Sequence, residues 1–125
     1  MYVHKIEKEL LCPLEYGLDI FGGKWKSRII CVLSAHGTMR YSELRKELSN
    51  ITDAVLAAML KEMIADGMIS RKQYDEIPPK VEYALTQEGQ SVLPILQSIC
   101  SWSRIKTKDN IDKKLPSCKT CSQLA

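Results

Sequence analysis

Cys12 is the residue of this sequence whose type and position most directly suggest chemistry. It precedes Pro13 and Glu15, an order that predicts a helix from Pro13 to about Phe21, because proline suits the first helical position and a carboxylate suits the first turn. The partial positive charge at a helix N-terminus stabilises a thiolate, the nucleophilic and oxidisable form of cysteine. The alternative is that Cys12 only begins the helix and its thiol does not react.

Cys118 and Cys121 form a C-x-x-C pair in a polar, lysine-rich tail. A zinc site usually needs four ligands, and His4 and His36 lie far away in the sequence. The pair could instead close a disulfide, share thiolates with a second chain, or have no role. A thiol oxidoreductase is disfavoured because such motifs normally start a helix in a βαβ unit. Since paired-carboxylate, Ser-His-Asp and phosphate-loop patterns are also missing, we predict no metal, no cofactor and no enzymatic activity.

The remaining cysteines, Cys31 and Cys100, fall within apolar helical patterns and are predicted to pack in the interior. Five cysteines form an odd number without the spacing of a disulfide framework, which is typical of the reducing cytosol. The N-terminus lacks the apolar core of a secretory signal, and no apolar run is long enough to span a bilayer. The sequence thus predicts a cytoplasmic protein without a membrane partner.

A chain of 125 residues is expected to form one domain around a single core. Apolar residues make up 45% of the sequence and charged residues 26%, as in ordinary globular proteins. The net charge of +3 favours an anionic partner but is smaller than that of a dedicated nucleic-acid binder. Composition alone therefore does not decide the function.

Hydrophobic periodicity and helix-breaking residues divide the chain into short elements. We expect an N-terminal helical arm over residues 1–11, the domain proper over 12–104 and a polar, flexible tail over 105–125. Within the domain, the predicted order begins with a helix to Phe21, a helix from Trp25 to about His36, an extended segment at 39–41 and a short helix to Leu48. A helix from Thr52 to Asp66 and strands over 68–74 and 81–85 follow, and residues 86–89 then lead into a last helix that carries Val92 to Trp102.

Two of these helices, joined by about four residues, form a helix-turn-helix pattern. Thr52 is predicted to cap the second helix and Gly67 to end it. The segment Asp75–Lys80 contains two prolines, which exclude helix and fit the tip of a hairpin. The predicted fold class is therefore α+β and mainly helical: a winged helix-turn-helix domain with a two-stranded β wing. The C-terminal helix has a wider apolar surface than one core contact requires.

Six segments together resemble the HxlR-type family of bacterial regulators, over roughly Leu11 to Trp102. They are CPLEY at 12–16, GGKWK at 22–26, RYSEL at 40–44, DGMI at 66–69, PPKVEYALT at 78–86 and LPIL at 93–96. The resemblance implies a transcription regulator, which we expect to be a repressor, that dimerises through its terminal helices and binds double-stranded DNA at a palindromic operator. It also implies that the helix from Thr52 is the recognition helix. Cys12 occupies the position that oxidant- and electrophile-sensing members use, where its modification would change the angle between the two recognition helices of the dimer.

A DNA-binding winged helix needs cations that hold the phosphates while a helix lies in the major groove. The hairpin supplies the candidates Arg71, Lys72 and Lys80. Outside the hairpin, Arg40 lies just before the helix pair, and Lys24 and Lys26 lie near the start of an adjacent helix. These three residues are further candidates. The alternative for each is ordinary solvated surface charge.

The predicted recognition helix departs from the family in its outward face. Its candidate DNA-contacting residues are Thr52, Asp53, Ala54, Ala57, Ala58 and Lys61, whereas the resemblance implies glutamine, lysine or threonine on this face. Alanine methyl groups suit thymine methyl groups, but Asp53 is expected to compete with phosphate for the helix N-terminus. The alternative function is therefore a degenerate module that binds a protein partner through its alanine face, with weak or no specific DNA binding.

Overall fold

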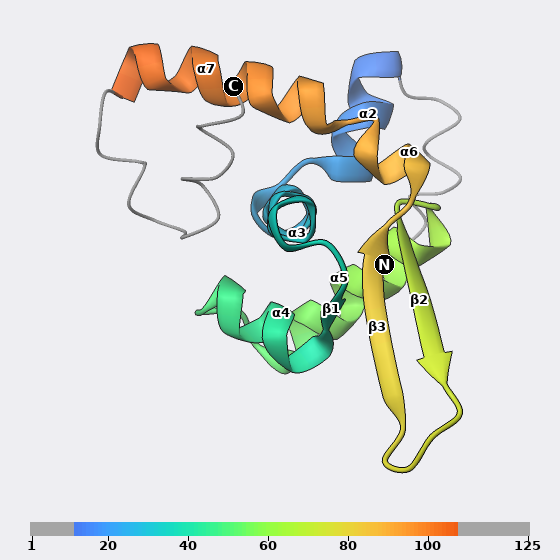
Figure 1. Ribbon diagram of the computed structural model, residues 1–125. Helices are drawn as coiled ribbons and strands as arrows, with labels where there is room; N and C mark the ends of the chain where they lie inside the picture. Colours follow the sequence, from blue (N-terminus) through green and yellow to red (C-terminus); the bar gives the residue numbers. More distant parts are fainter. Residues whose placement is uncertain (1–11, 108–125) are drawn as a thin grey trace.

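The computed structural model describes residues 12–107, so the arm predicted at 1–11 and the cysteine pair of the tail lie outside the described residues. The elements are, in order, α2 (Pro13–Phe21), α3 (Lys24–His36), β1 (Met39–Arg40), α4 (Tyr41–Leu48), α5 (Asp53–Ala65), β2 (Ile69–Tyr74), β3 (Lys80–Leu85), α6 (Gln87–Gln90) and α7 (Leu93–Thr107). α3 lies at the centre, with α2, α6 and α7 towards one end of the molecule and α4 and α5 towards the other (Figure 1). This arrangement confirms the predicted helix-rich α+β winged helix-turn-helix fold.

The core is organised around α3. Its residues Ile29, Ile30, Val32 and Leu33 have no more than 1% of their surface exposed. They form one apolar cluster with side chains of the other elements, including Leu44, Leu48, Leu56, Leu60, Met63, Met68 and Ile69. Burial of one such side chain stabilises a fold by about 1.5–3 kcal/mol. The positions of α4 and α5 are therefore fixed mainly by their contacts with the apolar core.

The sheet has three antiparallel strands in the order β1-β3-β2. β2 and β3 form the predicted hairpin, with Ile69 opposite Leu85 and Tyr74 opposite Lys80. β1 is a finding that the sequence did not reveal, because the extended segment was not expected to pair. It joins the edge of β3 through Met39, which lies opposite Tyr83. The wing is thus attached directly to the segment that leads into α4.

The segment that was expected to lead into the last helix forms a short helix of its own, α6, which Ser91 and Val92 separate from α7. Pro94 explains the break: in a continuous helix it could not donate to the Gln90 carbonyl, and its ring would clash there. At the second position of α7 the same proline costs no hydrogen bond. α7 has 15 residues, and no helix within residues 12–107 is long and apolar enough to cross a bilayer.

Candidate nucleic-acid interface

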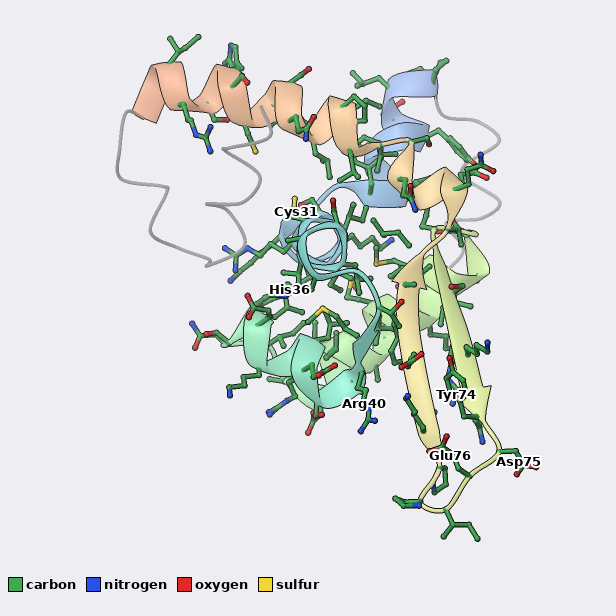
Figure 2. The ribbon with its side chains drawn as sticks, in the orientation of Figure 1. Cys31, His36, Arg40, Tyr74, Asp75 and Glu76 are labelled. Atoms are coloured by element: carbon green, nitrogen blue, oxygen red, sulfur yellow. The ribbon has the colours of Figure 1, made fainter. Side chains whose placement is uncertain are left out.

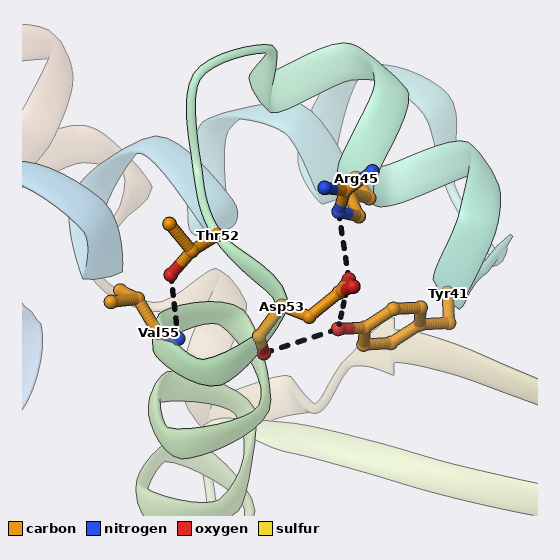
Figure 3. A network of polar contacts seen from close by, with 5 residues as sticks. All are labelled: Tyr41, Arg45, Thr52, Asp53 and Val55. Carbon is orange, nitrogen blue, oxygen red and sulfur yellow. Dashed lines mark hydrogen bonds and ion pairs between the residues drawn. The ribbon is translucent and has the colours of Figure 1, made fainter.

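α5 is anchored to the core by one face and open on the other. The Thr52 hydroxyl oxygen accepts a hydrogen bond from the Val55 amide at 3.2 Å (Figure 3), which confirms Thr52 as the N-cap. Leu56, Leu60 and Met63 are buried on the inner face. The outer side chains are all exposed and are Ala54, Ala57, Ala58 and Lys61. α5 therefore presents the bare surface that the sequence predicts.

The connection between α4 and α5 is a tight turn of residues 49–52. Ser49 has a left-handed backbone with φ of 63°, and its N–H donates to the carbonyl oxygens of Arg45 at 3.1 Å and Lys46 at 3.3 Å. Ile51 is 3% exposed and anchors the turn in the core. These contacts fix the direction in which α5 leaves α4 and confirm the helix-turn-helix pattern.

Asp53, the first residue of α5, is paired with two side chains of α4 (Figure 3). Its Oδ1 atom lies 2.7 Å from Arg45 Nε and accepts a hydrogen bond from the Tyr41 hydroxyl at 3.1 Å. Burial and the hydrogen bond to Asp53 raise the pKa of Tyr41 above its ordinary value, so this hydroxyl is a donor at neutral pH. The sequence predicts a lone carboxylate that opposes phosphate, but in the structure Arg45 offsets its charge.

Arg45 is a residue of this surface that the sequence reasoning missed. Eight positions separate it from Asp53, and this spacing places no contact on a single helix. Only the turn at 49–52 brings the two side chains together. The available signal was a basic residue in the last turn of one helix followed by an acidic residue at the start of the next.

The hairpin carries three of the predicted phosphate-binding cations, in two different environments. Arg71 and Lys72 are exposed on β2, and Lys72 Nζ lies 4.9 Å from the centre of the Tyr74 ring. Lys80 Nζ lies at the same distance from that ring and 3.3 Å from Glu82 Oε2. Lys80 is therefore partly engaged within the hairpin, whereas the side chains on β2 are more accessible to an anion.

The tip of the hairpin is acidic. Asp75 and Glu76 are exposed there and lie at the far end of the projecting strands (Figure 2). Behind them, the Tyr74 hydroxyl donates to Glu82 Oε1 at 2.8 Å. This hydrogen bond lowers the pKa of Glu82, and Lys80 acts in the same direction. Because carboxylates repel phosphate, an anion is favoured at the strands of the hairpin rather than at its tip.

A cavity of about 290 Å³ brings predicted residues of α5 and the hairpin onto one surface. It is lined by Tyr41, Ala57, Leu60, Lys61, Ile64, Arg71 and Tyr83. Lys61 and Arg71 come from different elements, and within residues 12–107 no carboxylate forms an ion pair with either. The open face of α5 is thus continuous with two cations that are accessible to a ligand.

Arg40 and Lys24 are also exposed, as expected for phosphate-binding candidates. Arg40 lies opposite Glu82 in the sheet register and points away from the core, towards the end of the molecule where the hairpin tip lies (Figure 2). Lys24 begins α3, and its Nζ lies 4.7 Å from the centre of the Trp25 ring. Both side chains are therefore accessible to an anion.

The sequence predicts a phosphate contact for Lys26, and this prediction is wrong. Lys26 is 8% exposed, its Nζ lies 2.8 Å from Glu62 Oε1, and it donates to the Asp19 carbonyl oxygen at 3.0 Å. Two positions along a helix correspond to a rotation of about 200°, so Lys26 faces the interior where Lys24 faces solvent. Lys26 joins α2, α3 and α5 instead of binding a ligand.

A family model described as HxlR-like helix-turn-helix matches residues 20–111. The chain belongs to this family. An uncharacterized HTH-type transcriptional regulator from Methanothermobacter thermautotrophicus is 39% identical over 112 residues, which are 88% of this chain and 85% of the relative. The solved structure of the HTH-type regulator ytcD has a TM-score of 0.75 at 39% identity and covers 79% of this chain and all of its own. The solved structure of the redox regulator HypR in its oxidized form has a TM-score of 0.70 at 38% identity, and the match covers 78% of this chain and 99% of the HypR chain.

Membership of the HxlR-like family confirms the resemblance seen in the sequence. The family consists of transcriptional regulators rather than enzymes, and this chain is a DNA-binding transcription regulator of the helix-turn-helix type. The alanine face of α5 and the exposed cations beside it are the candidate surface for DNA. The alternative of a protein-binding module gains no support from these relatives.

The cysteines of this HxlR-like chain differ in exposure. Of the three within residues 12–107, Cys12 is exposed, whereas Cys31 and Cys100 are partly buried. Cys31 packs against the core, in agreement with its predicted packing role. Cys12 is the N-cap of α2, and its backbone N–H donates to Glu15 Oε1 at 3.3 Å. Cys12 is therefore the most accessible thiol of the described residues.

The terminal helices of the domain expose an unusual amount of apolar surface. On α2 and α7, the large exposed apolar side chains are Leu14, Tyr16, Leu18, Ile95, Ile99, Trp102 and Ile105. Both helices lie at the end of the molecule opposite the hairpin tip (Figure 1). Apolar clusters of this kind on a folded domain usually mark a protein interface.

Proposed function

We propose that this HxlR-like regulator binds double-stranded DNA with α5 in the major groove and the cations of the hairpin on the flanking phosphates. The supporting observation is that the open face of α5 is continuous with Lys61 and Arg71. A helix fits the major groove, and phosphate contacts fix its register. The proposed phosphate contacts are Lys61, Arg71 and Lys72, with Arg40, Lys24 and Lys80 in secondary positions. The proposed groove-facing residues are Thr52, Asp53, Ala54, Ala57 and Ala58.

The proposed functional unit is a homodimer on a palindromic operator, with residues 12–104 as the DNA-binding unit. The exposed apolar side chains of α2 and α7 support this proposal, since they lie away from α5 and the hairpin. A two-fold dimer would place its two recognition helices about one DNA turn apart, roughly 34 Å. Its proposed site of action is the cytoplasm, its proposed output is repression, and no catalytic step is involved. Sedimentation should detect a dimer, and Trp102→Glu should shift it towards the monomer.

The DNA-binding proposal is tested by charge-removing variants. We expect Lys61→Gln and Arg71→Gln each to weaken binding to every duplex and to reduce the slope of log K against log[salt] by about 2, because each removes one phosphate contact per protomer of the dimer. Arg104→Gln on α7 is the charge-matched control, since α7 lies at the opposite end of the molecule. If Lys61→Gln and Arg71→Gln both bind DNA like Arg104→Gln, the proposed surface is wrong.

The proposed regulation is oxidation or alkylation of Cys12. Its exposed, free thiol supports this proposal, as does the similarity to the redox regulator HypR. Lys26 would transmit a change at Cys12 to the recognition helix, because it contacts both the Asp19 carbonyl oxygen of α2 and Glu62 of α5. A movement of α2 would therefore shift α5. In this proposal, two Cys12 thiols of a dimer form a disulfide while diamide accepts the two electrons and two protons.

Cys12→Ser tests the regulatory proposal. We expect this variant to bind DNA like the wild type under reducing conditions and to lose the change in affinity caused by diamide or quinones. Replacing Cys31 by serine serves as a control, since that side chain packs against the core and should leave the response intact. A full diamide response in Cys12→Ser would assign sensing to another residue.

A further inference from the structure

The contact between Arg45 and Asp53 holds an arginine at the edge of the open face of α5 (Figure 3). Asp53 Oδ1 engages Nε of Arg45 at 2.7 Å and also accepts from the Tyr41 hydroxyl at 3.1 Å. Use of Nε leaves the two terminal Nη nitrogens, which form a planar fork of donors. The Arg45 side chain is 47% exposed. Its position is therefore fixed while a bidentate donor edge stays accessible.

The nearly neutral charge of this pair favours one type of ligand. A phosphate offers acceptors only, and the Asp53 carboxylate, which is 72% exposed, would repel it. In the major groove, a G·C base pair offers the O6 and N7 acceptors of guanine together with the N4 amino donor of cytosine. Arginine donors beside a carboxylate acceptor match this combination. A base pair is thus a better ligand for the Arg45–Asp53 pair than the DNA backbone.

The rest of the open face provides little base discrimination. Ala54, Ala57 and Ala58 have no side-chain donor or acceptor, and their methyl groups favour at most the thymine methyl group. We propose, building on the DNA-binding function proposed above, that Arg45 is a specificity-determining residue that donates two hydrogen bonds to a guanine. Asp53 and Tyr41 are its positioning residues. Each half-site then contains one G·C pair contacted by Arg45, next to positions that accept A·T pairs.

Base analogues test this assignment on the unmodified protein. A random duplex pool is selected with the full-length wild type, and the guanine enriched in each half-site is then replaced one position at a time. We expect 7-deazaguanine, which lacks the N7 acceptor, to weaken binding, and adenine to weaken it by about 10- to 100-fold. Inosine is the matched control, because it keeps O6 and N7 in the major groove and should bind like guanine.

Variants of the cluster assign the effect to its residues. We expect Arg45→Ala to lose the preference for guanine over adenine at that position, with a smaller change in affinity for the adenine duplex. Asp53→Asn and Tyr41→Phe keep the arginine but loosen its position, so both should reduce the preference without abolishing DNA binding. A purely structural role would instead lower the affinity for both duplexes equally. Thermal unfolding identifies any variant that fails to fold. The base-analogue series uses the wild-type protein and therefore does not depend on the folding of the variants.

The outcomes separate this inference from the proposed function. Loss of guanine preference in Arg45→Ala, together with sensitivity to 7-deazaguanine, supports the assignment. If Arg45→Ala weakens binding to all duplexes and reduces the salt slope of the dimer by about 2, Arg45 binds phosphate and the assignment is wrong. A selected pool without a guanine in each half-site also overturns it, although DNA binding stands. A wild-type protein that binds no duplex overturns both.

Discussion

Glu62→Leu should destabilise the domain strongly, because it leaves the buried ammonium of Lys26 without its carboxylate. Lys26 is 8% exposed and lies 2.8 Å from Glu62 Oε1, with the Asp19 carbonyl as a further acceptor. Removal of one partner of a buried ion pair costs about 3–5 kcal/mol. The Glu62 side chain is 24% exposed, so water screens the pair in part, and we expect about 2–3 kcal/mol. In a domain of this size, the expected fall in Tm is roughly 8–12 °C.

Urea unfolding followed by far-UV circular dichroism at pH 7 measures this effect. The series contains the wild type, Glu62→Leu, Lys26→Met and the double variant. Because Lys26→Met removes the buried cation, the double variant should be more stable than the sum of the single effects predicts, by about 1–2 kcal/mol. Lys61→Met, at the exposed neighbouring position of α5, is the control and should stay within about 0.5 kcal/mol of the wild type. A similarly small effect of Glu62→Leu, or strict additivity, would refute the reasoning.

Two further predictions concern the hairpin and α6. Tyr74→Phe removes the hydrogen bond that lowers the pKa of Glu82, so NMR titration should show that pKa moving up. The stabilisation of the hairpin by ionised Glu82 is present above the unfolded pKa of Glu82 and is lost as the pH falls through its lowered folded pKa. An unchanged pKa of Glu82 in Tyr74→Phe would contradict this cause. Gly89→Ala would place its Cβ against the Met68 carbonyl oxygen, and should destabilise the domain by about 2 kcal/mol in urea unfolding. Gly17→Ala in α2 meets only ordinary contacts and should be neutral or stabilising; equal effects of the two alanines would argue against the close approach at α6.

Local signals in the sequence predicted most of the elements. Thr52 was identifiable as an N-cap because its side chain bonds a backbone group only three residues away. Gly67 was identifiable as a helix end because glycine readily adopts the positive φ that often ends a helix. In the structure its φ is 80°. The hairpin followed from the two prolines between its strands. In each case the physical cause lies within a few residues of the signal.

Features that depend on distant contacts were not predictable in the same way. β1 has only two residues, and its pairing exists because β3 passes beside it. The burial of Lys26 depends on Glu62, which is 36 positions away, and hydrophobic periodicity counts lysine as a surface residue. The pairing of Arg45 with Asp53 depends on the turn between two helices. Pro94 is the exception, since its position carried a local signal for the break before α7 that the periodicity concealed.

The measurement that tests the central claim most directly is the salt dependence of DNA binding by the full-length protein. Fluorescence anisotropy with a duplex that contains the gene's own promoter, at salt concentrations from about 50 to 200 mM, gives log K against log[salt]. Three phosphate contacts per protomer, from Lys61, Arg71 and Lys72, give six in a dimer and a predicted slope of about −5. No salt-sensitive association with this or any other duplex would contradict the account of α5 and the hairpin as a DNA-binding surface.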